Sequence, residues 1–231
     1  MTEADDLVFK AKNYFKKYPR FFFIFYNLVA VFIGKTAKQF VATLPDDAVI
    51  VNIGSGVKTI HPRVINVDMR ASPDVQIVAS AYALPFPDAS VDAVISESLL
   101  EHLEHPEIAV QEMYRVLRPG GMVYILTPFM IGFHSSPGDY YRWTIPGMKQ
   151  LLKNFEIHES GVAVGPTSAL TAILREWLAM LLSFGSKTLY QLWVLCFMVL
   201  LIPLNLLDFY MRYLPFNSTI ALAYYCIAKK A

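Results

Sequence analysis

A glycine turn between two apolar strands is the stretch of this chain best suited to hold a ligand. Val49–Ile53 is almost wholly apolar, which is typical of a strand buried on both faces of a parallel sheet. Gly54 and Gly56 follow it and allow a sharp turn that a ligand can approach without meeting a Cβ atom. A second apolar run ends on Asp68, which places a carboxylate at the carboxyl end of a strand. Ligands of doubly wound sheets bind outside these ends, where such an acid accepts hydrogen bonds from ribose hydroxyls.

Four further motifs follow this turn in order along the chain. They are ALPFPD at 83–88, VDAVI at 91–95, LEHL at 100–103 and LRPGG at 117–121. Together with the glycine turn, this ordered set resembles the class I S-adenosylmethionine-dependent methyltransferases, in the branch that includes quinone and sterol methylases. The resemblance extends over residues 49–128 and implies an α/β fold, a Rossmann-like, doubly wound and mostly parallel sheet of seven strands.

The resemblance also implies S-adenosyl-L-methionine as the cofactor. The cofactor-binding residues that it implies are Asn52, Gly54, Ser55, Gly56, Asp68, Met69, Ser80, Ala81, Tyr82, Glu97 and Ser98. Residues 52–56 would border the methionine moiety, Asp68 the ribose, and residues 80–82 together with Met69 the adenine. Glu97 and Ser98 would lie under the methyl-donor end. The chain departs from the family pattern at positions 52 and 80, where an amide and a hydroxyl replace acids but can still form hydrogen bonds.

Residues 129–144 follow the fifth predicted strand, over the expected acceptor site. They resemble the H-x-x-P-x-D-Y-x-R-aromatic-T segment of a less characterised methyltransferase group, often associated with glycan or lipid pathways. We interpret His134 as a general base for a hydroxyl acceptor, oriented by Asp139, because a histidine pKa of about 6.5 suits proton removal near neutral pH. Arg142 would bind an acidic or phosphate group, and Tyr140 and His102 complete the predicted substrate-binding residues. The alternative is a structural loop in which the acid at 139 and the arginine at 142 pair with each other.

Composition limits the possible classes of function. The chain of 231 residues is long enough for one domain with an attachment, and its net charge of +1 offers no electrostatic basis for binding nucleic acid. An apolar fraction of 55% and a mean hydropathy of +0.40 are both high for a soluble protein. Cys196 and Cys226 stand in apolar surroundings and are interpreted as reduced packing residues of a cytosol-facing protein. No Cys/His cluster in the sequence predicts a metal site.

Residues 1–44 are predicted to form a basic and aromatic helical segment. Its apolar part, Phe21–Gly34, has fourteen uncharged residues, fewer than the ~20 that span a bilayer. Lys35 follows without a small-residue cleavage site, which excludes a signal peptide. An interfacial helix whose basic residues meet anionic headgroups is one alternative, and a helix that covers the core is the other.

Short connections between the first strands are the reason for considering the core-covering helix. Ten residues, Gly54–Arg63, separate the first two strands, and six, Met69–Asp74, separate the second from the third at Val75–Ala79. A crossover that contains a helix needs at least ~10–12 residues. Both connections are therefore predicted to be loops or single turns. One or both faces of this half of the sheet then lack their usual helices, and Phe21–Val41 could supply the missing cover.

The second half of the sheet is predicted to be regular. Strands are expected at 91–96, 122–127 and 155–164, and the seventh at Thr219–Ala228. Pro106 suits the first turn of a helix that ends before Pro119, and Thr144 can cap a helix to about Asn154. The methyltransferase domain would thus comprise residues 45–165 and 216–231.

Residues 166–215 are predicted to be a hydrophobic, membrane-associated helical insertion. Twenty uncharged residues lie between Lys187 and Asp208, which by length could span a bilayer. The seventh strand must rejoin the sheet, however, so an odd number of crossings is excluded. A two-helix hairpin could use Thr171–Phe184 as its first arm, but Arg175 and Glu176 would be costly at mid-membrane and Pro203 breaks the second arm. An insertion that dips into or lies on one leaflet is therefore favoured.

The sequence as a whole predicts a membrane-associated S-adenosylmethionine-dependent methyltransferase at the cytoplasmic face, acting on a hydrophobic or lipid-linked acceptor. In the nearer alternative the acceptor is a soluble small molecule, and the apolar insertion is a lid or a dimer contact. In the other, the chain is a non-catalytic membrane-bound scaffold that has kept the fold. The sequence makes no prediction about the oligomeric state.

Overall fold

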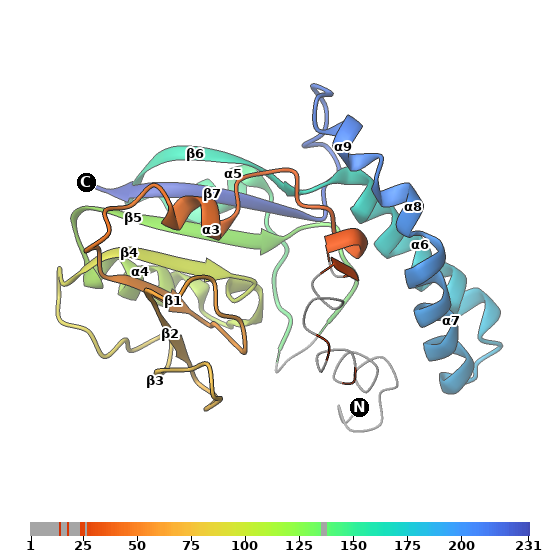
Figure 1. Ribbon diagram of the computed structural model, residues 1–231, viewed down its shortest axis with the longest axis horizontal. Helices are drawn as coiled ribbons and strands as arrows, with labels where there is room; N and C mark the ends of the chain where they lie inside the picture. Colours follow the sequence, from red (N-terminus) through yellow and green to blue (C-terminus); the bar gives the residue numbers. More distant parts are fainter. Residues whose placement is uncertain (1–13, 15–17, 19–23, 26, 135–137) are drawn as a thin grey trace. The chain divides into compact units, whose positions relative to one another are not determined.

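The computed structural model describes residues 14, 18, 24–25, 27–134 and 138–231 (Figure 1). The chain divides into two compact units. The sheet unit comprises residues 34–129, 133–163 and 223–231, and the helical unit comprises residues 1–33, 130–132 and 164–222. The domain boundaries inferred from the sequence stay a prediction.

A seven-stranded mixed sheet forms the centre of the sheet unit. Its strands are β1 (Ile50–Ile53), β2 (Val64–Asp68), β3 (Ile77–Val78), β4 (Val91–Glu97), β5 (Leu117–Pro128), β6 (Phe155–Val164) and β7 (Ala223–Lys230). The strand order is β3-β2-β1-β4-β5-β7-β6. The pairs from β3 to β5 are parallel, whereas β7 runs antiparallel to β5. The predicted α/β fold with a mostly parallel seven-stranded sheet is therefore confirmed.

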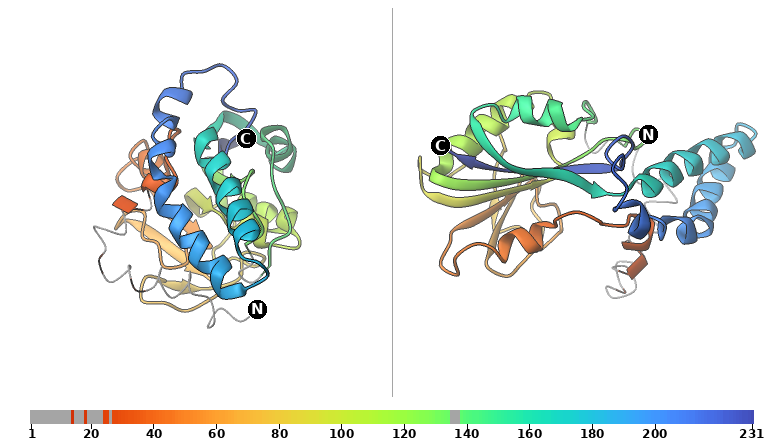
Figure 2. Two further views of the ribbon diagram at one scale, coloured as in Figure 1. Left: turned by 90° about the vertical axis from the view of Figure 1, so that its right-hand side faces the viewer. Right: turned by 90° about the horizontal axis from the view of Figure 1, so that it is seen from above.

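The connections between the first three strands contain no helix, which confirms the prediction from their lengths. Helix α3 (Ala37–Val41) lies on one face of the sheet, and α4 (Pro106–Val116) and α5 (Ile145–Leu151) lie on the other (Figure 2). Phe40 of α3 is buried, with its ring centroid 5.7 Å from that of Tyr124 on β5. The end of the N-terminal segment thus covers the core, as one of the two alternatives predicted.

The helix predicted through Gly34 is wrong at its carboxyl end. Phe32 forms an antiparallel bridge with Val164, and the amide of Gly34 donates to the carbonyl of Ala163 at 3.2 Å. A Cβ atom on Gly34 would lie 2.0 Å from the carbonyl oxygen of Val162. The chain therefore runs beside β6 in an extended conformation here, and position 34 has no room for a side chain. The apolar character of the segment did not indicate this. The basic residues predicted to meet headgroups, at positions 10, 12, 16, 17 and 20, lie outside the described residues.

Several element ends also differ from the sequence prediction. Strand β7 begins at Ala223 and not at Thr219, because Ala223 pairs with Pro128, the last residue of β5. Beyond that pair the backbone keeps single hydrogen bonds, from the amide of Met130 to the carbonyl of Ala221 and from the amide of Leu222 to that of Val164, both at 3.1 Å. Helix α5 begins after Thr144, whose hydroxyl accepts from the amide of Gly147 at 3.1 Å as predicted, but it ends at Leu151.

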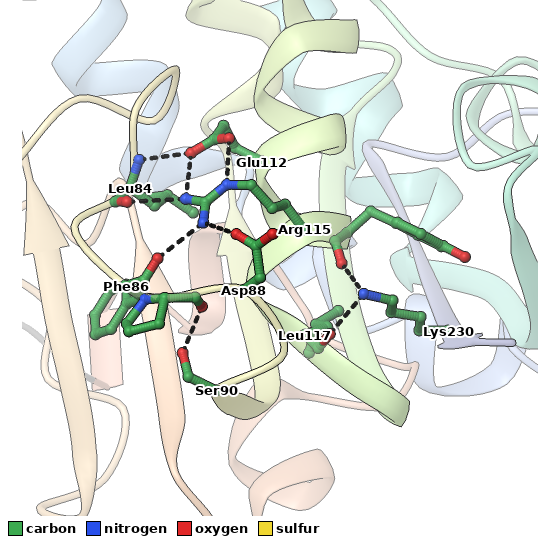
Figure 3. A network of polar contacts seen from close by, with 10 residues as sticks. Leu84, Phe86, Asp88, Ser90, Glu112, Arg115, Leu117 and Lys230 are labelled. Carbon is green, nitrogen blue, oxygen red and sulfur yellow. Dashed lines mark hydrogen bonds and ion pairs between the residues drawn. The ribbon is translucent and has the colours of Figure 1, made fainter.

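Arg115 on α4 connects this helix to the loop before β4 (Figure 3). Its guanidinium donates to Glu112 and Asp88, each at 2.7 Å, and to the carbonyls of Phe86 and Leu84 at 2.9 and 3.0 Å. These contacts hold the ALPFPD motif in place. The motif therefore links helix α4 to the loop before β4.

The helical unit contains four helices after β6 in the described chain. They are α6 (Pro166–Leu182), α7 (Lys187–Leu200), α8 (Ile202–Asn205) and α9 (Asp208–Met211). The fully buried carboxylate of Asp208 accepts from the amides of Thr167 and Ser168 at 2.7 and 2.9 Å, and from the hydroxyl of Ser168 at 2.7 Å. An anion is favourable at a helix N-terminus, so Asp208 caps α6 from a distant part of the chain.

Among the described helices, none is by itself both long and apolar enough to cross a membrane. Helix α7 and the segment Ile202–Met211 meet that length and composition only as a pair, with a bend of 47° between them. Pro203 lies in the first turn of α8, which confirms the predicted interruption of the apolar stretch.

Candidate functional site

The carboxyl ends of four neighbouring strands meet at one edge of the sheet. Strands β2, β1, β4 and β5 are adjacent and parallel, and the strand order reverses between β1 and β4. A ligand of an open α/β sheet binds at such a switch point. The structure therefore gathers there the glycine turn 54–56, Asp68 and Glu97, as the sequence predicted.

The glycine turn needs both of its glycines. Gly54 and Gly56 have φ values of 69° and 56°, in the left-handed region that favours glycine. A Cβ atom on Gly54 would lie 2.7 Å from the Leu99 side chain, whereas one on Gly56 would meet nothing within 4 Å. The backbone beside Gly56 thus borders open space, and Ser55 between the two glycines is buried.

Asp68 is held by the backbone at the end of β2. One carboxylate oxygen accepts from the amide of Gly56 at 2.8 Å, and the other accepts from the amide of Arg70 at 2.8 Å. Each carboxylate oxygen can accept a further hydrogen bond. The acid is therefore oriented beside the glycine turn and keeps acceptor capacity for a ligand.

The residues predicted to surround the adenine and the methionine differ in how far they are exposed to solvent. Asn52 is buried and donates to the side-chain oxygen of Asn66 at 3.0 Å, so it links β1 to β2 inside the sheet. The hydroxyl of Ser80 accepts from the amide of Tyr82 at 3.2 Å, which holds the turn that contains Ala81. Met69 is 67% exposed at the end of β2.

The predicted methyl-donor end lies just after β4. Glu97 forms an ion pair with Lys58, a residue of the loop after the glycine turn. Ser98 has a φ of 51°, an unfavourable value for a residue with a Cβ atom, and its amide donates to the carbonyl of Leu126 at 2.9 Å. Backbone strain of this kind is frequent at functional sites.

His134, Asp139 and Arg142 lie together after β5. The nearly inaccessible carboxylate of Asp139 accepts two hydrogen bonds from Arg142, one of 2.7 Å, and one from the amide of His134 at 2.8 Å. The Arg142 guanidinium lowers the pKa of Asp139 to about 2. The His134 Nδ1 atom lies 3.6 Å from Asp139 and 3.3 Å from Arg142. The Asp139–Arg142 pair of the structural alternative is thus formed, and the role of His134 as base stays a prediction.

Glu101 is a residue of this site that the sequence did not single out. Its side chain is fully buried, and neither carboxylate oxygen has a hydrogen-bond partner among the described residues. Burial raises the pKa of Glu101 to about 7. The only signal in the sequence is its place in the EHLEH run beside His102.

His102 and Tyr140 complete the predicted substrate-binding set. The Nδ1 atom of His102 donates to the carbonyl of Gly138, and its ring centroid lies 5.3 Å from that of His134 in an edge-to-face arrangement. The hydroxyl of Tyr140 donates to Glu104 at 2.8 Å, and its amide donates to the carbonyl of Glu101 at 2.7 Å. The site therefore joins a short helix, η2 (Leu100–His102), to the segment after β5.

Known proteins resemble this chain in sequence and in fold. Residues 56–125 match the model of a methyltransferase domain family. A putative sarcosine dimethylglycine methyltransferase from Galdieria sulphuraria superposes with a TM-score of 0.54 at 14% identity, over 84% of this chain and 85% of that one. The fold is that of the class I methyltransferases.

The curated relatives match over shorter stretches. A probable S-adenosylmethionine-dependent methyltransferase from Mycolicibacterium smegmatis is 51% identical over 55 residues, which are 24% of this chain and 21% of that protein. A ubiquinone/menaquinone biosynthesis C-methyltransferase from Chromobacterium violaceum is 38% identical over 79 residues, 33% of this chain and 32% of that protein. The chain thus spans between about a fifth and a third of the length of these relatives.

Proposed function

We propose that this protein is an S-adenosylmethionine-dependent methyltransferase. The observation that carries the proposal is the contact between the amide of Gly56, in the turn after β1, and the carboxylate of Asp68 at the end of β2. This contact lies at the switch point of a methyltransferase fold, within the residues that match the family model. A relative named as a probable S-adenosylmethionine-dependent methyltransferase is 51% identical to this chain over 55 residues.

The residues present fit S-adenosyl-L-methionine. The open space beside Gly56 leaves room for a ligand against the backbone, and Asp68 can accept hydrogen bonds from the two ribose hydroxyls. When bound, the cofactor supplies an electrophilic methyl group. The protein would then act mainly by fixing the cofactor on the glycine turn and by holding an acceptor in line, since positioning alone accounts for a large part of such rates.

Replacing Asp68 with alanine tests this placement. Loss of a charge-assisted contact to the ribose should weaken cofactor affinity about 30-fold, roughly 2 kcal/mol, in a calorimetric titration with S-adenosyl-L-methionine. Asp46→Ala removes a fully exposed carboxylate from the same unit and should leave the affinity unchanged. An unchanged affinity in Asp68→Ala, with the protein folded, would place the cofactor elsewhere.

The acceptor in this proposal is hydrophobic or lipid-linked and is met at the cytoplasmic face of a membrane, on which the protein lies without spanning it. What supports this is the exposed apolar surface of α6 and α7. Its large exposed side chains are Leu170, Ile173, Trp177, Met180, Leu181, Leu189, Leu192, Val199 and Leu200. Extensive exposed apolar surface is typical of membrane or protein contacts.

Co-sedimentation of the full chain with lipid vesicles tests the membrane part of the proposal. The protein should pellet with vesicles, and a Trp177→Glu/Leu181→Glu variant should bind at least about tenfold more weakly, because two apolar side chains leave the interface. A matched variant with Val57→Glu, an exposed apolar residue of the sheet unit, should bind like the parent. If the parent stays in the supernatant and methylates a soluble molecule, the alternative with a lid or a dimer contact is correct.

A further inference from the structure

The side chain of Glu101 places a carboxylate in the interior of the sheet unit. It has no exposed surface, and neither oxygen has a hydrogen-bond partner among the described residues. A buried carboxylate in that state is costly unless a proton or a cation satisfies it. The cationic side chain that acts on its charge, Arg142, is already engaged in the pair with Asp139.

Two imidazoles lie beside this carboxylate. One donor atom each from Glu101, His102 and His134 can be chosen so that all three lie within 4.8 Å of one another. In a tetrahedral zinc site with bonds of ~2.0–2.1 Å, donor atoms lie about 3.3 Å apart. Movements of about 1.5 Å or less in the side chains would therefore bring the three donors to one metal ion.

The surroundings also prepare His102 as a ligand. Its Nδ1 atom donates to the carbonyl of Gly138, so in the neutral ring the Nε2 atom carries the free lone pair. That Nε2 atom lies 3.8 Å from a carboxylate oxygen of Glu101. A backbone carbonyl that holds the distal nitrogen is the usual outer-shell partner of a metal-binding histidine, because it fixes the tautomer and the ring orientation.

We propose that Glu101, His102 and His134 bind one divalent metal ion of the zinc type. Two imidazoles and one carboxylate suit zinc, whereas magnesium and calcium prefer oxygen donors. Asp139 neutralises the charge of Arg142 in their ion pair, so Arg142 does not oppose the binding of a metal cation. Three protein ligands leave a fourth position open, as in zinc sites that bind a substrate.

The location gives this metal site a use in the proposed function, on which this part of the inference rests. The ligands follow β4 and β5, on the edge of the sheet where the acceptor would meet the cofactor. An oxygen of the acceptor bound at the open position would be oriented and polarised by the metal. His134 would then serve as a ligand and not as the general base.

Metal titration of the full-length protein, first stripped with a chelator, tests the inference without an activity assay. Calorimetry should show one Zn²⁺ per chain, bound at least about tenfold more tightly than Mg²⁺. Glu101→Gln keeps the shape of the side chain and should weaken Zn²⁺ binding at least about 100-fold, as should His102→Ala. His105→Ala is the matched control, because its imidazole is exposed and pairs with Glu107, and it should bind Zn²⁺ like the parent.

A second measurement keeps the result independent of folding defects. Zn²⁺ should raise the melting temperature of the parent and of His105→Ala, but not that of Glu101→Gln, each with an unchanged circular dichroism spectrum. Equal Zn²⁺ affinity in the parent and in a folded Glu101→Gln would overturn the site. If the protein binds S-adenosyl-L-methionine but no Zn²⁺, only the metal site fails and the proposed methyltransferase function stands.

Discussion

His134→Ala is expected to lower turnover by about 100-fold or more while leaving the affinity for S-adenosyl-L-methionine nearly unchanged. His134 lies beyond the end of β5, with its ring beside His102 and Arg142, whereas the cofactor is proposed to bind the turn at Gly56 and the carboxylate of Asp68. Whether the ring removes a proton or binds a metal ion, its loss affects the acceptor side. Steady-state kinetics and calorimetry on the same variant measure the two effects separately.

The control for this experiment is His105→Ala, which removes an exposed imidazole close in sequence to His102. It should keep normal turnover. A His134→Ala variant with near-normal turnover would exclude both chemical roles of the ring. Turnover, cofactor affinity and melting temperature that fall together would instead identify the segment around the Asp139–Arg142 pair as purely structural.

The pH profile and a chelator separate the two chemical roles. A general base with a pKa of about 6.5 makes activity rise with pH in that region, and His134→Ala would abolish this rise. In that case a chelator would leave the activity of the parent unchanged. A metal ligand predicts the opposite, namely activity that a chelator removes and that added Zn²⁺ restores.

Glu101→Gln is expected to remove a large pH dependence of stability from the metal-free protein. The pKa of Glu101 is raised from 4.5 to about 7, with desolvation as the largest cause. Below pH 4.5 the carboxyl is protonated in both the folded and the unfolded chain. Between the two pKa values only the unfolded chain releases the proton, so the free energy of unfolding falls as the pH rises. The total loss above pH 7 is roughly 3 kcal/mol.

Denaturant unfolding in chelator at about pH 4.5, 6 and 8 measures this effect as a difference between the parent and the variant. The parent should lose stability relative to Glu101→Gln as the pH rises, and the difference should level off above pH 7. Glu107→Gln changes an exposed glutamate on the same stretch and should follow the parent. Parallel curves for the parent and Glu101→Gln would mean that the Glu101 carboxylate is satisfied in solution.

The sequence by itself determined the strand architecture and the place of the cofactor site. The almost wholly apolar run Val49–Ile53 predicts a strand buried on both faces, because only such a strand places apolar residues on either side. The glycine turn and Asp68 could be assigned to one edge because parallel strands all end there. The missing crossover helices followed from loop length alone. These features could be predicted because each depends on residues that are close together in the sequence.

The tertiary structure alone decided what depends on distant partners. The start of β7 at Ala223 is set by the end of β5, and the extended backbone at Gly34 is set by its close approach to β6. In the sequence, Asp208 is only an acid at the end of an apolar run, so the sequence does not predict that it is buried against the first turn of α6. The same holds for Glu101, whose isolation and whose proximity to His134 arise only when the segment after β5 packs over η2. Local patterns carry no information about such contacts, because packing between residues far apart in the chain creates them.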